Sequence, residues 1–185
     1  MRAAIEKRFT HYQQKGCLNV SPELISYYAD LPGEAWVVRI PDDLYDAEQH
    51  FYVRNPDGRP VHLATIDKCL IGRVRPAPKR CDCVFFDDLD VCFIEFKLRA
   101  KGQANADDQN QETRLIQAGN QLLAGIQQFG QDGIIGPHHQ VRAYAFVGYG
   151  PLFPAPTTTL TNSAEYINDS TRYFVDFDTK DSAVF

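Results

Sequence analysis

Three charged side chains near the middle of the chain have the types and spacing of a divalent-metal site. Glu95 follows Asp82 by thirteen residues, and Lys97 comes two residues after Glu95. The intervening run Asp87-Asp88-Leu89-Asp90 is typical of a tight turn, and its flanks are rich in β-branched and aromatic residues, so residues 81–98 are predicted to form a β-hairpin. In that hairpin Asp82 lies roughly opposite Glu95 and Lys97, and two carboxylates and an ammonium converge.

The pattern of the second strand indicates that this group is partly buried. Side chains alternate along a strand, so Glu95 and Lys97 share one face while Ile94 and Phe96 point to an apolar core. A charged pair in such a setting is costly unless it has partners. Two carboxylate ligands with room for waters suit Mg²⁺ or Mn²⁺, and the lysine is suited to orient an attacking water. A structural ion pair between Asp82 and Lys97 is the competing interpretation.

Periodicity and turn signals predict the elements that must position these residues. In the first half of the chain they are a helix over 3–15, a helix from Ser21-Pro22 to about Tyr28, a strand over 35–40, one or two helical turns over 42–49, a hairpin of 51–54 and 61–66, and a sheet extension over 69–74. In the second half they are strands over 81–86 and 91–98, a polar loop over 101–111, a helix over 112–129, a strand over 141–147, an irregular loop over 151–161 and a strand over 173–177.

The predicted helix over 112–129 carries an apolar stripe and a separate face that includes Gln117 and Gln121. A helix between a hairpin and a later strand indicates an α/β or α+β fold, with a mixed central sheet flanked by helices. With 185 residues and no internal repeat or linker, the chain is expected to form a single domain over 1–185.

Composition excludes several classes of protein. The net charge of −5 argues against non-specific coating of nucleic acid, and no apolar run is long enough to span a membrane. No P-loop or serine-hydrolase motif is present. Five cysteines without a signal-peptide pattern suggest free thiols, a reducing compartment and a cytoplasmic location. Cys81 and Cys83 fall on one face of a predicted strand, where packing is favoured over a zinc site.

Basic residues are nevertheless concentrated around the hairpin. Eight of the 19 lysines and arginines lie within 34 positions, and these are Lys68, Arg73, Arg75, Lys79, Arg80, Lys97, Arg99 and Lys101. Such a local basic face is suited to hold a phosphate backbone, and the alternative is a solvated charged surface.

The spacing Asp-x(12)-Glu-x-Lys on a hairpin, followed by a long helix, resembles that of the PD-(D/E)XK nuclease superfamily, which has the restriction-endonuclease-like fold. The spacing is similar to that of archaeal Holliday-junction resolvases and RecB-like nucleases, and the sequence from Lys79 to Lys97 also resembles that of small bacterial members. The resemblance covers about residues 61–148, which would form the nuclease-like core. The N-terminal helical and strand segments and the C-terminal segment would then be extensions.

The resemblance implies a metal-dependent nuclease that hydrolyses phosphodiester bonds of nucleic acid, with DNA as the expected substrate. It implies that Asp82, Glu95 and the backbone carbonyl of Phe96 hold Mg²⁺ or Mn²⁺, and that Lys97 handles the water. Many members also use a glutamine on the helix after the lysine, for which Gln117 and Gln121 are both candidates.

Several alternatives stay open. An additional acid from the N-terminal part would be Glu6, Glu23 or Glu48, and the spacing does not select one. The proline of the motif is absent, since Arg80-Cys81 precede Asp82, and the isoelectric point is low. These two facts favour, as the alternative function, a catalytically silent binding or regulatory module that keeps the nuclease fold. DNA against RNA, internal against terminal cleavage, and a homodimer are also left open.

Overall fold

The computed structural model is built around a six-stranded mixed sheet. It describes residues 1–10, 16–21, 23–30, 37–46, 49–67, 69–71, 80–97, 108–146 and 157–185. In chain order the elements are α1 (Arg2–Arg8), β1 (Leu18–Ser21), β2 (Ile25–Ala29), β3 (Val38–Ile40), the 3₁₀ turn η1 (Asp42–Leu44), β4 (Phe51–Arg54), β5 (Val61–Thr65), β6 (Cys83–Phe86), β7 (Asp90–Phe96), α3 (Asp108–Gln131), β8 (Gln140–Phe146), α4 (Thr157–Asp169), β9 (Val175–Asp178) and β10 (Ser182–Val184).

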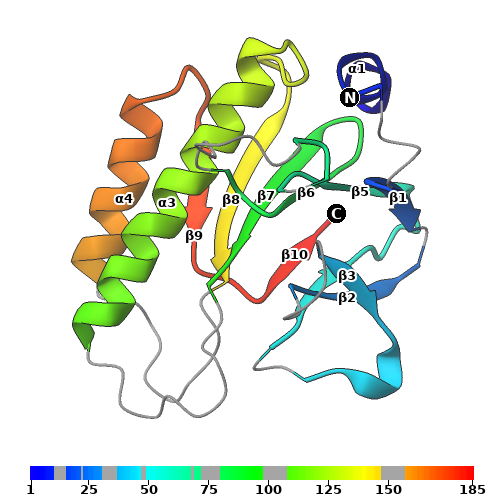
Figure 1. Ribbon diagram of the computed structural model, residues 1–185, viewed down its shortest axis with the longest axis horizontal. Helices are drawn as coiled ribbons and strands as arrows, with labels where there is room; N and C mark the ends of the chain where they lie inside the picture. Colours follow the sequence, from blue (N-terminus) through cyan, green and yellow to red (C-terminus); the bar gives the residue numbers. More distant parts are fainter. Residues whose placement is uncertain are drawn as a thin grey trace.

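The larger sheet has the strand order β1-β5-β6-β7-β8-β9 (Figure 1). β6 and β7 form the hairpin predicted from the sequence, with Cys83 opposite Ile94. The side chain of Asp87 accepts the backbone N–H groups of Leu89 and Asp90 and so fixes the turn. Beyond the hairpin the sheet becomes parallel: β7 pairs with β8 and β8 with β9, and helices α3 and α4 precede β8 and β9 in the chain.

The smaller sheet has the strand order β10-β4-β2-β3. β2 pairs antiparallel with both β3 and β4. β10 joins β4 in parallel, with Ser182 opposite Tyr52. One side of this sheet shares a hydrophobic core with one face of the larger sheet, and Phe51 from β4 contacts Phe85 and Phe146 there.

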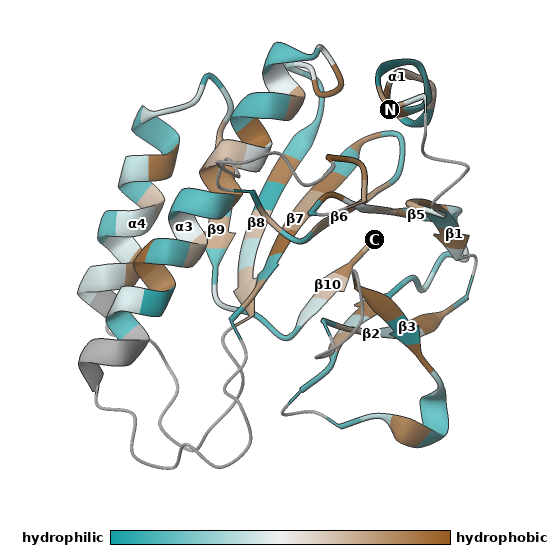
Figure 2. Ribbon diagram, viewed as in Figure 1, coloured by the Kyte–Doolittle hydropathy of each residue, from teal (hydrophilic) through white to brown (hydrophobic). Residues whose placement is uncertain are grey.

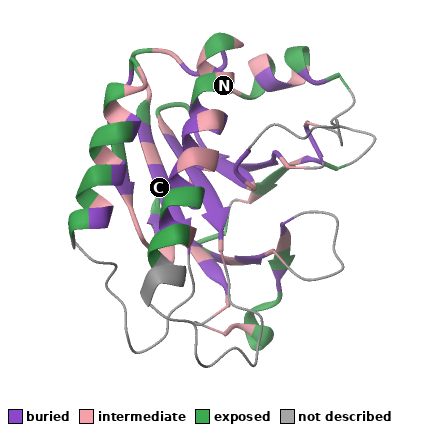
Figure 3. Cartoon of the chain, turned by 60° about the vertical axis from the view of Figure 1, so that its left-hand side comes forward, coloured by how far each residue is buried: buried purple, intermediate pink, exposed green. Residues whose placement is uncertain are grey.

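The layers are therefore helices, larger sheet and smaller sheet. On the helix side, Phe93 of β7 packs edge-on against Phe129 of α3 within a second core that also takes in Ile5 and Ile167. Figure 2 shows polar residues along α3 and α4, and Figure 3 shows the buried residues gathered in the strands. This arrangement confirms the mixed α/β class. Of the helices in the described ranges, none is long and apolar enough to cross a membrane.

The predicted helix from Ser21 to Tyr28 is wrong. Residues on both sides of position 22 are strands instead, β1 and β2. The Ser21 hydroxyl, at the predicted start of that helix, pairs with the hydroxyl of Ser26 at 2.9 Å. Tyr28 is buried between the sheets, so strand pairing and aromatic burial outweigh the local helix-start signal.

The predicted hairpin of 51–54 with 61–66 is also wrong, although both strands exist. β4 belongs to the smaller sheet and β5 to the larger one. The turn signal between them is real: Asn55 exchanges two hydrogen bonds with the backbone of Arg59, at 2.6 and 3.0 Å. The turn moves the chain from one sheet to the other, which a local motif does not reveal.

Several other boundaries differ from those predicted. The first helix ends at Arg8, and residues 11–15 lie outside the described residues. The strand over 35–40 is confirmed for 38–40, and residues 35–36 lie outside the described residues. Of the helical turns over 42–49, η1 covers 42–44, and residues 47–48 lie outside the described residues. Helix α3 starts at Asp108, inside the predicted loop, and α4 replaces the end of the predicted loop over 151–161. Of the predicted extension over 69–74, the described residues 69–71 form a turn with a single bridge from Asp67 to Ile71.

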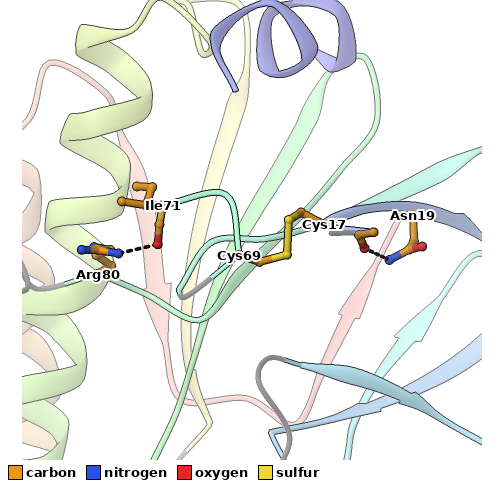
Figure 4. Close-up of a disulfide and its surroundings, with 6 residues drawn as sticks. Cys17, Asn19, Cys69, Ile71 and Arg80 are labelled. Carbon is orange, nitrogen blue, oxygen red and sulfur yellow. Dashed lines mark hydrogen bonds between the residues drawn. A yellow bond between two sulfur atoms is a disulfide. The ribbon is translucent and has the colours of Figure 1, made fainter. Parts of the chain in front are cut away.

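A disulfide joins Cys17, just before β1, to Cys69, in the turn after β5 (Figure 4). The expectation of five free thiols is therefore wrong for this pair, because pairing of β1 with β5 brings together residues 52 positions apart. The cysteine count thus no longer supports a reducing compartment. Cys81, Cys83 and Cys92 are free and buried. The prediction that Cys81 and Cys83 share a face is wrong, because Cys81 belongs to the core beside the helices and Cys83 to the core between the two sheets.

We expect the paired change Cys17→Ala and Cys69→Ala to lower the free energy of unfolding by about 2–4 kcal/mol, because the bridge constrains a long loop in the unfolded chain. Thermal unfolding with and without reductant measures this. Reductant should lower the melting temperature of the wild type and leave that of the double variant unchanged. A wild type indifferent to reductant would show that the bridge does not contribute.

Candidate metal centre

Asp82 is held at the open end of the β6–β7 hairpin by two backbone groups of β7. Its N–H donates to the carbonyl of Ile94 at 3.2 Å, and its Oδ2 accepts the N–H of Phe96 at 2.7 Å. The pairing of β6 with β7 ends at Cys83 and Ile94, and Asp82 and Glu95 are the residues next to this pair. Their side chains interact directly, so the two carboxyl groups lie together.

Glu95 lies on the helix-facing side of β7 and is almost fully buried, with 1% of its surface exposed. The Lys97 ammonium donates to Glu95 Oε1 and, at 2.6 Å, to Oε1 of Gln121 on α3. Gln121 in turn donates through Nε2 to the carbonyl of Arg80 at 2.8 Å. The predicted convergence of Asp82, Glu95 and Lys97 is therefore present in the structure.

The two candidate glutamines occupy different environments. Gln121 is partly buried and bonds to Lys97, whereas Gln117, one helical turn earlier, is exposed. Among the described residues, no hydrogen bond joins Gln117 to the acids or to the lysine. The geometry thus favours Gln121 as the helical member of the site.

Burial sets the protonation of both acids. Burial raises the pKa of Asp82 to about 6, partly offset by the hydrogen bond from the Phe96 amide. The carboxylates of Asp30 and Asp67 push in the same direction as burial. Burial also raises the pKa of Glu95 well above its usual value, with the neighbouring Asp82 carboxyl adding to the shift and Lys97 opposing it. Both acids therefore bind protons more tightly than exposed carboxyl groups do, and a cation at this place would compete with those protons.

The residues present fit a divalent cation. Among the described residues, the second oxygen of Glu95, Oε2, is buried without a hydrogen-bond partner, which is unusual for a carboxyl in a core. A hard cation beside Asp82 would satisfy it. The N–H of Phe96 faces Asp82, and since the N–H and C=O of a strand residue point the same way, its carbonyl is expected on that side too. No group of three or more His, Cys, Asp or Glu side chains gathers in the described ranges, so the carbonyl, water and substrate would complete such a site.

The sequence offered three N-terminal acids as further members of the site, and the two that the structure describes form ion pairs outside it. Glu6 pairs with Arg2 at 2.7 Å on α1, and Glu23 pairs with Arg39 on the smaller sheet. Glu48 lies outside the described residues. The acids that influence Asp82 are instead Asp30 and Asp67, which directly follow β2 and the turn residue Ile66. Strand pairing between distant segments brings them there, and no sequence spacing would have identified them.

The predicted basic face is only partly described. The side chains of Lys68, Arg73, Arg75, Lys79, Arg99 and Lys101 lie outside the described residues. Arg80 is buried, with 6% of its surface exposed, and donates to the carbonyl of Ile71 at 2.6 Å. The expectation that Arg80 follows a phosphate backbone is therefore wrong, because the guanidinium is used inside the protein.

Gly125 allows α3 to approach the start of β6. A Cβ at this position would lie 2.5 Å from Sγ of Cys81, closer than real Cβ atoms come. Gly125 lies one helical turn after Gln121, so the same close approach lets the Gln121 amide reach both Lys97 and Arg80.

We expect Gly125→Ala to destabilise the protein by about 1–3 kcal/mol, despite the higher helix propensity of alanine, because the added methyl group overpacks the contact with Cys81. The matched control is Gly119→Ala in the same helix. Its added Cβ would meet Ile167 and Ser163 at an ordinary 3.9 Å, so it should be neutral or stabilising by up to about 1 kcal/mol. Chemical denaturation measures both, and equal effects of the two changes would contradict the close-approach argument.

No protein-family model matches the chain, no curated protein matches its sequence, and no solved structure matches its fold.

Proposed function

We propose that this protein is a metal-dependent nuclease that hydrolyses phosphodiester bonds, with DNA as the expected substrate. One observation carries the proposal: a buried carboxyl group, a partly buried one and a lysine meet at the end of β7, and one oxygen of the buried carboxyl, among the described residues, has no hydrogen-bond partner. Charges are kept in such places for a function more often than for stability. The resemblance to the PD-(D/E)XK superfamily supports the same activity.

Each side chain has a role that follows from its contacts. Asp82 and Glu95, with the carbonyl of Phe96, would hold Mg²⁺ or Mn²⁺, which supplies Lewis-acid activation of the phosphate ester and of water. Lys97 is anchored twice, by Glu95 and by Gln121, so its ammonium keeps a defined position. An ammonium fixed there is placed to orient the attacking water and to offset charge that develops on the phosphate.

We expect Lys97→Ala to lower the rate of DNA cleavage by about 100-fold or more, because the positioned ammonium is lost while both acids remain. The matched control is Lys180→Ala, since Lys180 also pairs with an acid two residues before it, Asp178 at 3.3 Å, but lies beside β9. Plasmid and single-stranded DNA with Mg²⁺ or Mn²⁺ are the substrates. Cleavage that survives Lys97→Ala but not Lys180→Ala would refute the assigned role.

We also expect Mn²⁺ to bind more tightly as the pH rises, because the cation must displace protons from the acid pair. Calorimetric titration between pH 5.5 and 7.5 should show the apparent affinity rising by up to about tenfold per pH unit for each proton displaced, with proton release. Glu95→Gln should abolish binding. Affinity that is independent of pH, or that survives Glu95→Gln, would place the cation elsewhere.

Without metal, the same acids should make the protein less stable as the pH rises. The folded-state pKa of Asp82, about 6, lies above the unperturbed 3.8, so the folded chain holds this proton more tightly than the unfolded chain. The resulting stabilisation is present below pH 3.8 and is lost as the pH rises through 6. Denaturant unfolding in chelator should show this loss, and Asp82→Asn should weaken the pH dependence in that window.

The alternative is a nuclease fold that binds without cutting. Lys97 occupies Glu95 Oε1, and the raised pKa of Glu95 means that its carboxyl binds a proton more tightly than an exposed glutamate does. Binding of DNA without Mn²⁺ binding and without cleavage would favour this alternative over the nuclease.

A further inference from the structure

Arg80 is a buried cation two residues before Asp82 whose side chain points into the protein. Its Nη1 donates to the carbonyl of Ile71 at 2.6 Å (Figure 4), and the same nitrogen lies 3.9 Å from Oδ1 of Asp67. Both partners belong to one short turn after β5, the anchoring turn (residues 65–67 and 69–71). The side chain of Arg80 therefore ties the segment before β6 to this turn.

The anchoring turn is itself strongly constrained. Leu70 donates to the carbonyl of Thr65 at 3.1 Å and Ile71 to that of Ile66 at 3.0 Å. The disulfide links the turn through Cys69 to the start of β1 (Figure 4). The Arg80 side chain is therefore bound to a part of the chain whose position is constrained.

The same turn is also bonded to Asp82. The backbone N–H of Ile66 donates to the carbonyl of Asp82 at 2.8 Å, and that of Asp67 does so at 3.3 Å. The turn thus contacts the segment of residues 80–82 at both ends, through the Arg80 side chain and the Asp82 carbonyl.

The backbone of Arg80 faces the opposite way, toward α3. Its carbonyl accepts Nε2 of Gln121 at 2.8 Å, and the Oε1 of the same amide accepts the Lys97 ammonium at 2.6 Å. A carboxamide has one donor end and one acceptor end. When the Arg80 carbonyl holds the donor end, the acceptor end is directed at Lys97.

We propose that Arg80 is a positioning residue for Lys97, acting through the orientation of the Gln121 amide. The expected change in kcat rests on the proposed nuclease function, whereas the expected change at the Gln121 amide does not. The guanidinium fixes the Arg80 backbone against the anchoring turn, the backbone carbonyl orients Gln121, and Gln121 holds Lys97. Arg80 does not touch substrate in this scheme.

Arg80→Met tests this, since methionine fills part of the space and removes the donors. We expect kcat for DNA cleavage to fall by about tenfold, in the range of outer residues that orient a site. KM for DNA and the affinity for Mn²⁺ should stay within about twofold, because both acids keep their own contacts. Arg80→Lys keeps a charged donor group and is the milder change for folding. Its kcat should lie between that of the wild type and that of Arg80→Met.

The matched control is Arg142→Met. Arg142 on β8 also donates to a backbone carbonyl, that of Val184 at 2.7 Å, but it does so toward β10 rather than toward Gln121. Its removal should leave kcat unchanged. An equal fall of kcat in both arginine variants would overturn the proposal, because it would indicate a general loss of packing.

A double-mutant cycle with Gln121→Ala separates positioning from independent effects. If Arg80 acts through Gln121, Arg80→Met should lower kcat by less than about twofold in the Gln121→Ala background. A full tenfold loss in both backgrounds, or a matching loss of Mn²⁺ affinity, would overturn the assignment.

A readout without catalysis keeps this test apart from the nuclease proposal. In ¹⁵N NMR spectra, the side-chain amide of Gln121 should exchange slowly with solvent in the wild type and at least tenfold faster in Arg80→Met. If the wild type cleaves no DNA but the amide responds in this way, the nuclease proposal fails and the positioning role stands. An amide that is unchanged in Arg80→Met, and in Arg80→Lys, overturns the positioning role whatever the activity.

Discussion

The site depends on keeping the carboxyl of Glu95 inside the protein, between the larger sheet and α3. A carboxyl there needs partners close by, because desolvation strongly disfavours its charged form. Lys97 provides one partner and must itself be held by Gln121. Gln121 reaches Lys97 only because α3 approaches the strands closely, which Gly125 permits. One buried acid thus explains a lysine, a glutamine and a glycine that are far apart in the sequence.

The acids are carried by β7 and by the segment just before β6. Asp82 is bonded through its backbone to Ile94 and Ile66 and through its side chain to Phe96, so β7 and the turn after β5 fix it. Sites supported by strands hold their geometry better than sites on loops.

The sequence allowed the hairpin, the long helix and the three converging charged residues to be predicted, because each depends on local periodicity and on the two-residue alternation of strands. It did not allow the second sheet, the disulfide or the approach of Asp30 and Asp67 to be predicted, since each depends on pairing between distant segments. Ser21-Pro22 and Asn55-Pro56-Asp57-Gly58 show the limit clearly. Both carry good local signals, yet tertiary pairing decided the role of each.

The parallel pairing of β10 with β4 has a consequence for how the chain reaches its native state. Residues 182–184 pair with residues 52–54, about 130 positions earlier. The smaller sheet is therefore incomplete until residues 182–184 have been synthesised, and the edge of β4 that pairs with β10 has no partner during that time. Contacts of such long sequence separation slow folding and leave strand edges open to wrong pairing. Completion of the smaller sheet, rather than of the hairpin with the acids, would then limit the folding rate. The unpaired edge of β4 would be the part of the chain most exposed to aggregation.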